Sequence, residues 1–228
     1  DGTAGDADVL TGANNYIVDG SDSGTSTRVS DGFSNIENLT GTTGADSFSF
    51  DAGGQLTGTA DGLGGAGSFV LLGNASAGLL QGGAGDDSVD LGGFTLTGAV
   101  DGGTNNDTLA GADNYTLTGA NGGTSTQASG GFSNVENLTG TAGADTFALN
   151  GGSVTGTLDG VGGDDVLSGS TSYTVTGADT GSATGVALWQ NIENLTGTAG
   201  ADSFAFNAGA SLTGDARGLG GDDSFTLT

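Results

Sequence analysis

The segment Gly32-Phe-Ser-Asn-Ile-Glu-Asn-Leu-Thr-Gly-Thr42 decides the fold class, because it returns almost unchanged at 131–141 and again at 188–198. Each copy continues into the same five-residue pattern, Gly-Ala-Asp-Ser/Thr-Phe. Self-similarity at a fixed long period is typical of stacked supersecondary units. The sequence therefore predicts a repeat architecture.

The long period is 58 residues, since Asp101, Asp159 and Arg217 occupy successive equivalent positions. We interpret the whole chain, 1–228, as one segment built from these repeats, with two extra coils inserted. The predicted divisions are 1–60, the two-coil insertion 61–100, 101–158, 159–216 and a partial unit at 217–228.

A shorter period lies inside the long one, marked by a corner motif, Gly-x-x-Gly-x-Asp-x-apolar. Its sixth position recurs at intervals of 38, 21, 20, 20, 38, 20, 37 and 21 residues, at Asp8, Asp46, Gly67, Asp87, Asp107, Asp145, Asp165, Asp202 and Asp223. We interpret each long interval as two coils, of which the one carrying Asn-x-Glu-Asn-Leu-Thr-Gly lacks the motif. This count predicts about eleven coils of 19–20 residues.

The segments between the corners have the pattern of strands. Residues 173–177, 203–206 and 224–228 alternate apolar with small polar residues, and glycine clusters separate such segments. Alternation with period two indicates strands, and glycine indicates turns. An antiparallel sandwich and a disordered chain are the alternatives, but neither predicts a sustained 20-residue lattice. The expected fold is all-β, a right-handed parallel β-helix, also called a β-solenoid.

The aromatic residues keep the same phase as the corners. The three tyrosines, Tyr16, Tyr115 and Tyr173, each lie eight residues after a corner position. Two further sets recur at other phases, namely Phe33, Phe132 and Trp189, and Phe48, Phe147 and Phe204. We therefore expect separate ladders of like residues on successive coils.

Composition and charge exclude several function classes. The chain has 27 acidic residues against two basic ones, a formal net charge of −25, and neither cysteine nor histidine. Nucleic acids and anionic membranes require basic patches, and no stretch of about 20 apolar residues is present. We expect neither nucleic-acid binding nor membrane insertion, and an extracellular or cell-surface location. Because the chain opens on Asp1 within a repeat, we expect it to be a segment of a longer protein.

Residues Gly82–Asp90, Gly-Gly-Ala-Gly-Asp-Asp-Ser-Val-Asp, resemble the calcium-binding RTX nonapeptide at every fixed position. In that family the sixth-position aspartate and turn carbonyls hold Ca²⁺, and oxygen ligands suit this cation. The resemblance implies candidate ligands on pairs of adjacent coils, at Asp87, Asp107, Asp145, Asp165, Asp202 and Asp223. RTX repeats recur every nine residues, whereas these corners recur about every twenty. The alternative is that each aspartate caps its turn by accepting backbone N–H bonds.

The order of these motifs along the whole chain resembles the repeat regions of giant bacterial surface and secreted proteins, the filamentous-haemagglutinin-like and RTX-like adhesins. The resemblance implies a structural stalk or scaffold that projects other domains. Its expected partners are itself, through flanking repeats or end-to-end stacking, and surfaces or polysaccharide. A self-assembling extracellular fibre is the alternative, since incomplete end coils allow heterologous addition.

Enzyme activity is not expected. Many polysaccharide lyases and hydrolases are parallel β-helices, so a carbohydrate-active enzyme is the hypothesis to test. General acid–base catalysis needs carboxylates in contrasting environments, or a histidine or lysine tuned near neutrality. The chain has no histidine and no lysine, and its two arginines, Arg28 and Arg217, share no phase. An active site breaks repeat symmetry at one place, whereas regular aspartate rows indicate architecture.

Three asparagines stand in formal glycosylation sequons of the type Asn-Leu-Thr, at Asn38, Asn137 and Asn194. Such sequons permit N-glycosylation in a secreted protein. Stacked asparagine ladders in turns are the alternative. The neighbouring glutamates, Glu37 and Glu193 among them, are expected to lie in solvated turns.

Overall fold

The computed structural model describes residue 2 and residues 7–228. Within these residues the chain forms strands and turns but no helix, and its strands belong to two large, mostly parallel sheets. The expected all-β class is therefore confirmed. Residues 3–6, which begin the first corner motif, lie outside the described part.

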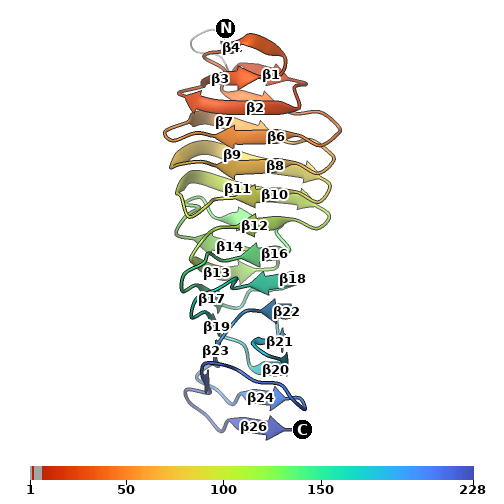
Figure 1. Ribbon diagram of the computed structural model, residues 1–228, viewed down its shortest axis with the longest axis vertical. Helices are drawn as coiled ribbons and strands as arrows, with labels where there is room; N and C mark the ends of the chain where they lie inside the picture. The colour runs from red at the N-terminus through yellow and green to blue at the C-terminus, as the bar shows by residue number, and fades with distance from the viewer. Residues whose placement is uncertain (1, 3–6) are drawn as a thin grey trace. The chain divides into compact units, whose positions relative to one another are not determined.

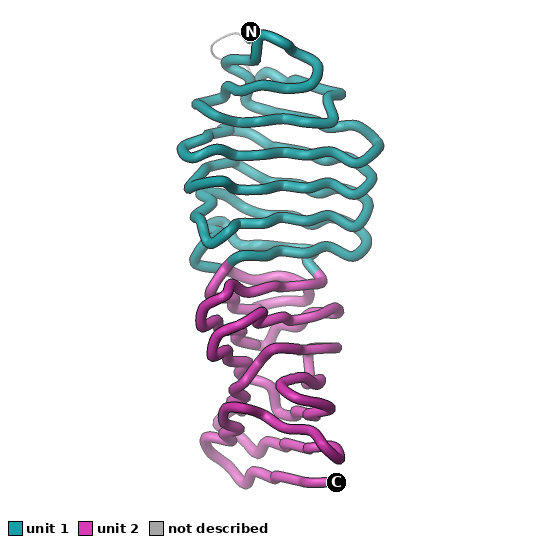
Figure 2. The backbone as a smooth tube through the Cα atoms, in the orientation of Figure 1, with its two compact units in different colours: residues 1–111, 125–135 teal, residues 112–124, 136–228 magenta. Residues whose placement is uncertain are grey.

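The chain divides into two compact units, which Figure 2 shows in different colours. Figure 1 labels their strands. Unit 1 comprises residues 1–111 and 125–135, and unit 2 comprises 112–124 and 136–228. No helix that could cross a membrane occurs in the described ranges. Each unit contributes strands to both sheets, which we call the first sheet (containing β1) and the second sheet (containing β2).

In unit 1 the first sheet has the spatial order β1 (Val9–Thr11), β5 (Asn38–Thr40), β7 (Gln55–Asp61), β9 (Ala75–Ala84), β11 (Leu96–Thr104) and β15 (Phe132–Ser133). Its second sheet has the order β12 (Thr108–Ala110), β10 (Ser88–Asp90), β8 (Ser68–Leu71), β6 (Ser47–Phe50), β2 (Asn15–Gly20), β3 (Ser23–Ser26) and β4 (Val29–Phe33).

In unit 2 the first sheet has the order β14 (Gly122–Ser125), β13 (Asn114–Gly119), β17 (Thr146–Leu149), β19 (Val166–Ser168), β23 (Asn194–Thr196) and β25 (Ala216–Arg217). Its second sheet has the order β26 (Ser224–Leu227), β24 (Ser203–Phe206), β20 (Ser172–Gly177), β21 (Thr180–Ala183), β22 (Val186–Gln190), β18 (Val154–Asp159) and β16 (Asn137–Thr139).

The 20-residue lattice is clearest in the middle of unit 1, where consecutive strands alternate between the two sheets. In the second sheet Ser47 pairs with Ser68, Ser68 with Ser88, and Ser88 with Thr108, all in parallel register. β6, β8 and β10 lie one below another in Figure 1. The predicted coil length therefore holds from residue 47 to residue 110.

Apolar side chains fill the space between the sheets as registered ladders. In the first sheet of unit 1 one ladder follows a continuous set of parallel partners, each aligned with the next: Leu10, Leu39, Ala60, Leu80, Val100 and Phe132. Leu39, Ala60 and Leu80 are fully buried. One strand alone could not bury such a face, so the fold depends on stacking each strand between neighbours.

Two of the three long intervals, 8–46 and 165–202, are not pairs of ordinary coils, which corrects the eleven-coil interpretation. In unit 1, β2, β3 and β4 form an antiparallel excursion, and β20, β21 and β22 form a corresponding one in unit 2. Val9 pairs with Asn38, so the spacing there is 29 residues instead of about 20. The reason lies in the turns: Asp22 and Asp179 both adopt φ 48° between two strands, a conformation that aspartate tolerates and that closes tight hairpins.

The aromatic ladders also differ from the expectation of like residues on separate phases. Tyr16 stacks on Phe48, which stacks on Phe69, with ring centroids 5.1 and 4.8 Å apart. In unit 2, Tyr173 stacks on Phe204 at 5.0 Å. Tyrosine and phenylalanine share one ladder because β2 pairs directly with β6, and β20 with β24, although the hairpin strands lie between them in the sequence. Each excursion thus keeps the core continuous.

Candidate functional site

The corner aspartates are the main polar feature of the interior. The side chains that are at most 4% exposed include six of them, Asp46, Asp87, Asp107, Asp145, Asp165 and Asp202. A buried carboxylate is costly unless hydrogen bonds or opposite charges compensate it. These six positions are therefore where the structure must supply partners.

Three corners supply partners from within their own turn. Asp145 Oδ2 accepts the Thr141 N–H at 2.8 Å, and its Oδ1 accepts the Thr141 hydroxyl at 3.0 Å. Asp46 with Thr42 and Asp202 with Thr198 repeat both bonds at the same distances. We call these Thr corners. At them the expectation that aspartate caps its own turn is confirmed.

The other corners use their carboxylate to hold the neighbouring turn. Asp87 Oδ1 accepts the Gly67 N–H at 2.6 Å, and Asp107 Oδ1 accepts the Asp87 N–H at 2.8 Å. In unit 2, Asp165 Oδ1 accepts the Asp145 N–H at 2.7 Å. Successive corners are therefore linked by carboxylate-to-backbone bonds that run along the stacking direction.

Asp223 repeats this link at the far end of unit 2, where its Oδ1 accepts the Asp202 N–H at 3.0 Å. Together with Asp87, Asp107 and Asp165 it forms the set that we call open corners, because none has a threonine four residues earlier. The corresponding residues there are Gly83, Gly103, Val161 and Leu219, all with positive φ. The Val161 N–H donates instead to Asp159 Oδ1 at 2.9 Å, so it adds no bond to the Asp165 carboxylate.

Two glutamates take the same linking role, which the sequence did not indicate. Glu193 Oε2 accepts the Asp165 N–H, and Glu37 Oε2 accepts the Asp8 N–H, each at 2.8 Å. Both stand one residue before the asparagine of the repeated Asn-Leu-Thr strand. The sequence signal was their fixed place in the repeat, and both residues lie outside strands and are partly exposed.

At two of the open corners one carboxylate oxygen has no hydrogen bond. Among the described residues, Asp87 Oδ2 and Asp165 Oδ2 are buried and have no hydrogen-bond partner. A Cβ on Gly82 would lie 2.5 Å from Asp87 Oδ2, and one on Gly160 would overlap Asp165 Oδ2. The glycine five residues before each open-corner aspartate is therefore needed for space, not for an unusual φ.

Burial raises the pKa of the Asp87, Asp145 and Asp165 carboxyl groups. For Asp165 the pKa rises to about 6, mainly through desolvation; the Asp145 N–H bond lowers it, and the charges of Asp145, Glu193 and Asp164 raise it further. Desolvation likewise raises the pKa of Asp87, against the bond from Gly67. At Asp145 desolvation raises the pKa, but both bonds from Thr141 oppose it. The Asp165 carboxylate is thus less well stabilised than the Asp145 carboxylate.

The six predicted calcium ligands are brought together only in neighbouring pairs. Each contributes one carboxylate that already binds backbone or threonine donors, and the described ranges contain no cluster of three or more His, Cys, Asp or Glu side chains placed to hold a metal ion. Calcium takes six to eight oxygen ligands. These corners do not by themselves supply that number, and calcium binding stays a prediction.

The three sequon asparagines also connect neighbouring turns. Asn38 Oδ1 accepts the Thr59 N–H, Asn137 Oδ1 the Thr157 N–H, and Asn194 Oδ1 the Asp215 N–H, each at 3.0 Å. Asn38 Nδ2 also donates to the Asp8 carbonyl at 3.3 Å. Their amides support an asparagine ladder, and glycosylation at these positions remains an untested prediction.

The polar arrangement as a whole joins turn to turn through aspartate, glutamate and asparagine side chains. The chain matches no family model, and it shows no significant similarity to a curated protein or to a solved structure.

Proposed function

We propose that this chain is a structural module, a right-handed parallel β-helix that serves as stalk or scaffold in an extracellular bacterial surface adhesin or exoprotein. The observation that carries the proposal is the continuous series of parallel strand pairs, such as the ladder from Leu10 to Phe132. In a stack of this kind each repeat contacts only the adjacent repeats, so the stack can be lengthened by adding further repeats.

The placement of polar groups supports a scaffold. Buried carboxylates bond backbone N–H groups of the adjacent turn, as Asp107 does with Asp87 and Asp165 with Asp145. Charged side chains are thereby used to hold turns together. The high negative charge of the remaining surface favours solubility and opposes nonspecific association of neighbouring chains.

Electron microscopy of the purified chain tests the scaffold. We expect discrete, unbranched particles of one length, with a far-ultraviolet circular dichroism spectrum of β-structure. Particles of random shape, or a disordered spectrum, would refute the parallel β-helix and the stalk together.

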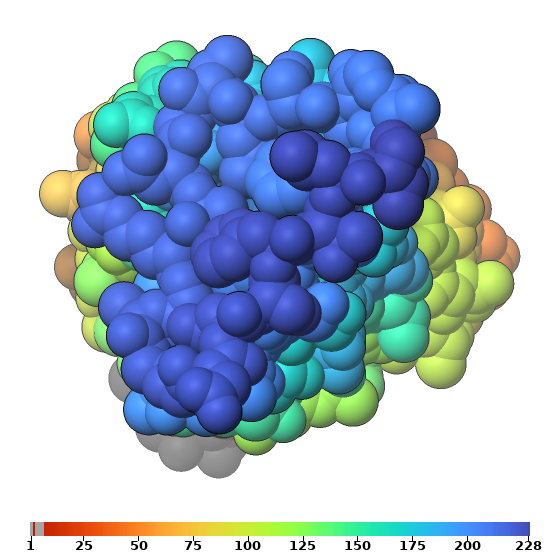
Figure 3. Space-filling view, turned by 90° about the horizontal axis from the view of Figure 1, so that it is seen from below, coloured from red at the N-terminus to blue at the C-terminus, as the bar shows by residue number. Residues whose placement is uncertain are grey.

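A self-assembling fibre is the second candidate, favoured by one observation at the end of unit 2. Phe225 and Leu227 of β26 are 55% and 86% exposed, although Phe225 continues the stack by lying 4.8 Å from Phe204. Figure 3 looks onto the last residues of the chain, which lie at the surface in this view. Long filaments that shorten in a Phe225→Asp/Leu227→Asp variant would favour the fibre, and concentration-independent single particles would exclude it.

Two further aspects of the proposal concern chemistry. We infer that the chain is not an enzyme, because it has no histidine or lysine and its corner carboxylates bond its own backbone. Activity towards a panel of acidic and neutral polysaccharides would overturn this inference.

For calcium, melting curves with Ca²⁺ and with excess chelator decide: a ligand bound only by the folded state raises the melting temperature, and coincident curves would exclude it as a stabiliser.

A further inference from the structure

Arg217 breaks the repeat at a single place. The equivalent positions 58 and 116 residues earlier hold Asp159 and Asp101, so an acid is replaced by a base. Two residues before it, Asp215 stands where the preceding repeat has Thr157, and both donate their N–H to the asparagine of the adjacent strand at 3.0 Å. The same backbone-to-asparagine bond therefore forms at the two places, although Thr157 lies within β18 and Asp215 lies just before β25, while the side chains differ.

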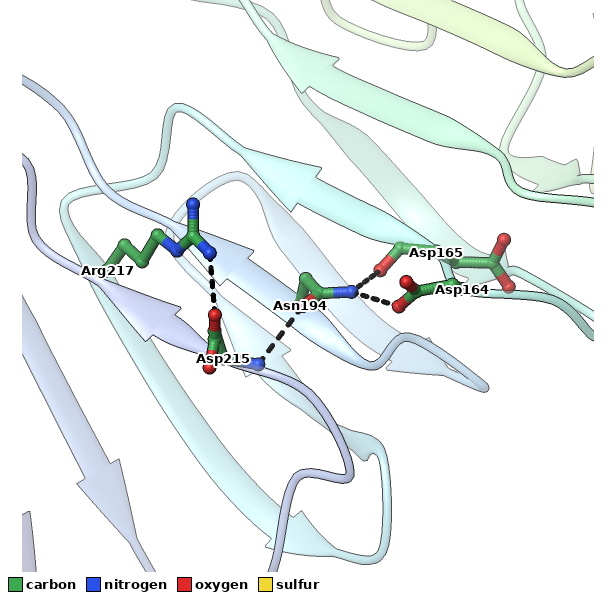
Figure 4. Close-up of polar contacts among 5 residues, drawn as sticks. All are labelled: Asp164, Asp165, Asn194, Asp215 and Arg217. Atoms are coloured by element: carbon green, nitrogen blue, oxygen red, sulfur yellow. Dashed lines mark hydrogen bonds and ion pairs between the residues drawn. The ribbon is translucent and has the colours of Figure 1, made fainter.

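The exchanged side chains join a line of polar contacts across β19, β23 and β25 of unit 2 (Figure 4). Asn194 Nδ2 donates to Asp164 Oδ1 at 2.6 Å, and Asn194 Oδ1 accepts the Asp215 N–H at 3.0 Å. Arg217 Nη2 then donates to Asp215 Oδ2 at 2.6 Å, the one ion pair found in the described part of the chain. The line passes through the Asp215 backbone, because Asn194 binds the Asp215 N–H and Arg217 binds the Asp215 carboxylate.

This line borders a hollow of about 240 Å³ on the outer side of the first sheet, whose inward residues Leu167 and Leu195 are fully buried. The hollow is lined by Asp164, Val166, Asn194, Thr196, Asp215 and Arg217. Pockets for drug-sized ligands span roughly 300–1,000 Å³, so this volume suits one small ring.

Its chemistry selects the class of ligand. Asp164 Oδ2 and Asp215 Oδ1 lie outside these hydrogen bonds, Arg217 has further donors besides the one that binds Asp215, and Thr196 adds a hydroxyl. An anion would meet two carboxylates in a chain of net charge −25, and a bare cation would meet the guanidinium. Donors and acceptors placed around a small hollow instead match the hydroxyl groups of an uncharged sugar.

We propose that the hollow at Arg217 binds one ring of a neutral saccharide. The line of contacts holds the donors and acceptors in place before the sugar arrives, which lowers the entropic cost of binding. Arg217 and Asp215 are the positions that create the site, and Val166 supplies an apolar contact for a face of the ring. The site goes beyond the scaffold role and does not depend on it.

NMR titration of the ¹⁵N-labelled chain with the methyl glycosides of glucose, galactose, mannose and N-acetylglucosamine tests the site. At least one glycoside is expected to shift the Asn194 side-chain amide and the Arg217 Nε–H in a saturable manner. The double variant D215T/R217D restores the residues of the preceding repeat, so it keeps the fold. It should weaken binding roughly tenfold or more, because charge-assisted hydrogen bonds are lost.

R28A is the matched control, since it removes the same charge in unit 1, where Arg28 Nε donates to the Gly12 carbonyl. Its glycoside affinity should equal that of the parent chain. The proposal fails if no glycoside shifts these signals in folded protein, if R28A weakens binding as much as D215T/R217D, or if Ca²⁺ or glucuronate alone produces the shifts. None of these results depends on whether the chain forms a stalk or a fibre.

Discussion

Asp145 and Asp165 occupy the same place in the corner motif on neighbouring turns of unit 2, yet their carboxylates accept different hydrogen bonds. Thr141 donates two hydrogen bonds to Asp145. Asp165 has Val161 at the same offset and receives only the Asp145 N–H, which leaves its Oδ2 without a partner. The residue four positions before the aspartate therefore decides whether the buried charge is satisfied.

The largest expected effect comes from filling the space that the open corner needs. Gly160→Ala places a methyl group against both Asp165 Oδ2 and the Asn191 carbonyl oxygen. Overpacking of a tight interior costs about 1–3 kcal/mol, and more where backbone must move. We expect a loss of free energy of unfolding at the top of this range, measured by urea denaturation.

Gly162→Ala is the control for that substitution. A Cβ at Gly162 would meet nothing within 4 Å, and the two glycines lie in one turn. Gly162→Ala should change stability little. If both variants lose the same free energy, the crowding at Asp165 is not what makes Gly160 necessary.

Removing the carboxylate charge should have opposite effects on the free energy of unfolding at the two corners. At neutral pH Asp145→Asn should destabilise the chain by about 1 kcal/mol, because charge-assisted bonds from Thr141 become neutral ones. Asp165→Asn should leave stability unchanged or raise it, because it removes a buried charge with an unpaired oxygen. Chemical denaturation of both variants provides the measurement. Equal losses would show that the two corners do not differ in energy.

The third prediction concerns pH. Because burial raises the pKa of Asp165 to about 6, the folded state binds a proton that the unfolded state has already released. The contribution of this group to stability is therefore complete below about pH 4, and it is lost as pH rises through about 6. The melting temperature of Asp165→Asn minus that of the parent chain should increase from pH 4 to pH 7. A constant difference would contradict the raised pKa.

Much of this fold follows from the sequence where the period is regular. The spacing of Gly67, Asp87 and Asp107 predicts the parallel register of β8, β10 and β12, which the structure confirms. The excursions escaped prediction because Asp22 and Asp179 lie in Gly-x-Asp patterns that resemble the corners themselves. A hairpin turn and a corner use the same residue types, and only the pairing of the strands separates them.

The candidate site was predictable in position but not in bonding. The sequence places these aspartates at equivalent corners, whereas their hydrogen bonds depend on the side chain and the backbone conformation of the residue four positions earlier. A β-branched residue such as Val161 strongly disfavours positive φ, so the sequence gives no sign that it adopts φ 70°. Likewise Glu193 reaches Asp165 only because β19 and β23 are neighbours.

The smallest expected effect tests that backbone conformation directly. Val161 is 48% exposed, and its N–H donates to Asp159 Oδ1 at 2.9 Å, so it holds φ 70° with little packing in return. A non-glycine residue in this region costs about 1–3 kcal/mol, and glycine's greater freedom in the unfolded chain offsets roughly 0.5–1 kcal/mol of any gain. Val161→Gly should therefore stabilise the chain by about 1 kcal/mol or less in urea denaturation.

Thr141→Gly makes the same replacement at the Thr corner and should destabilise the chain, because Asp145 loses the hydroxyl donor. If Val161→Gly also destabilises, the valine side chain stabilises the open corner by a contact that outweighs its backbone strain.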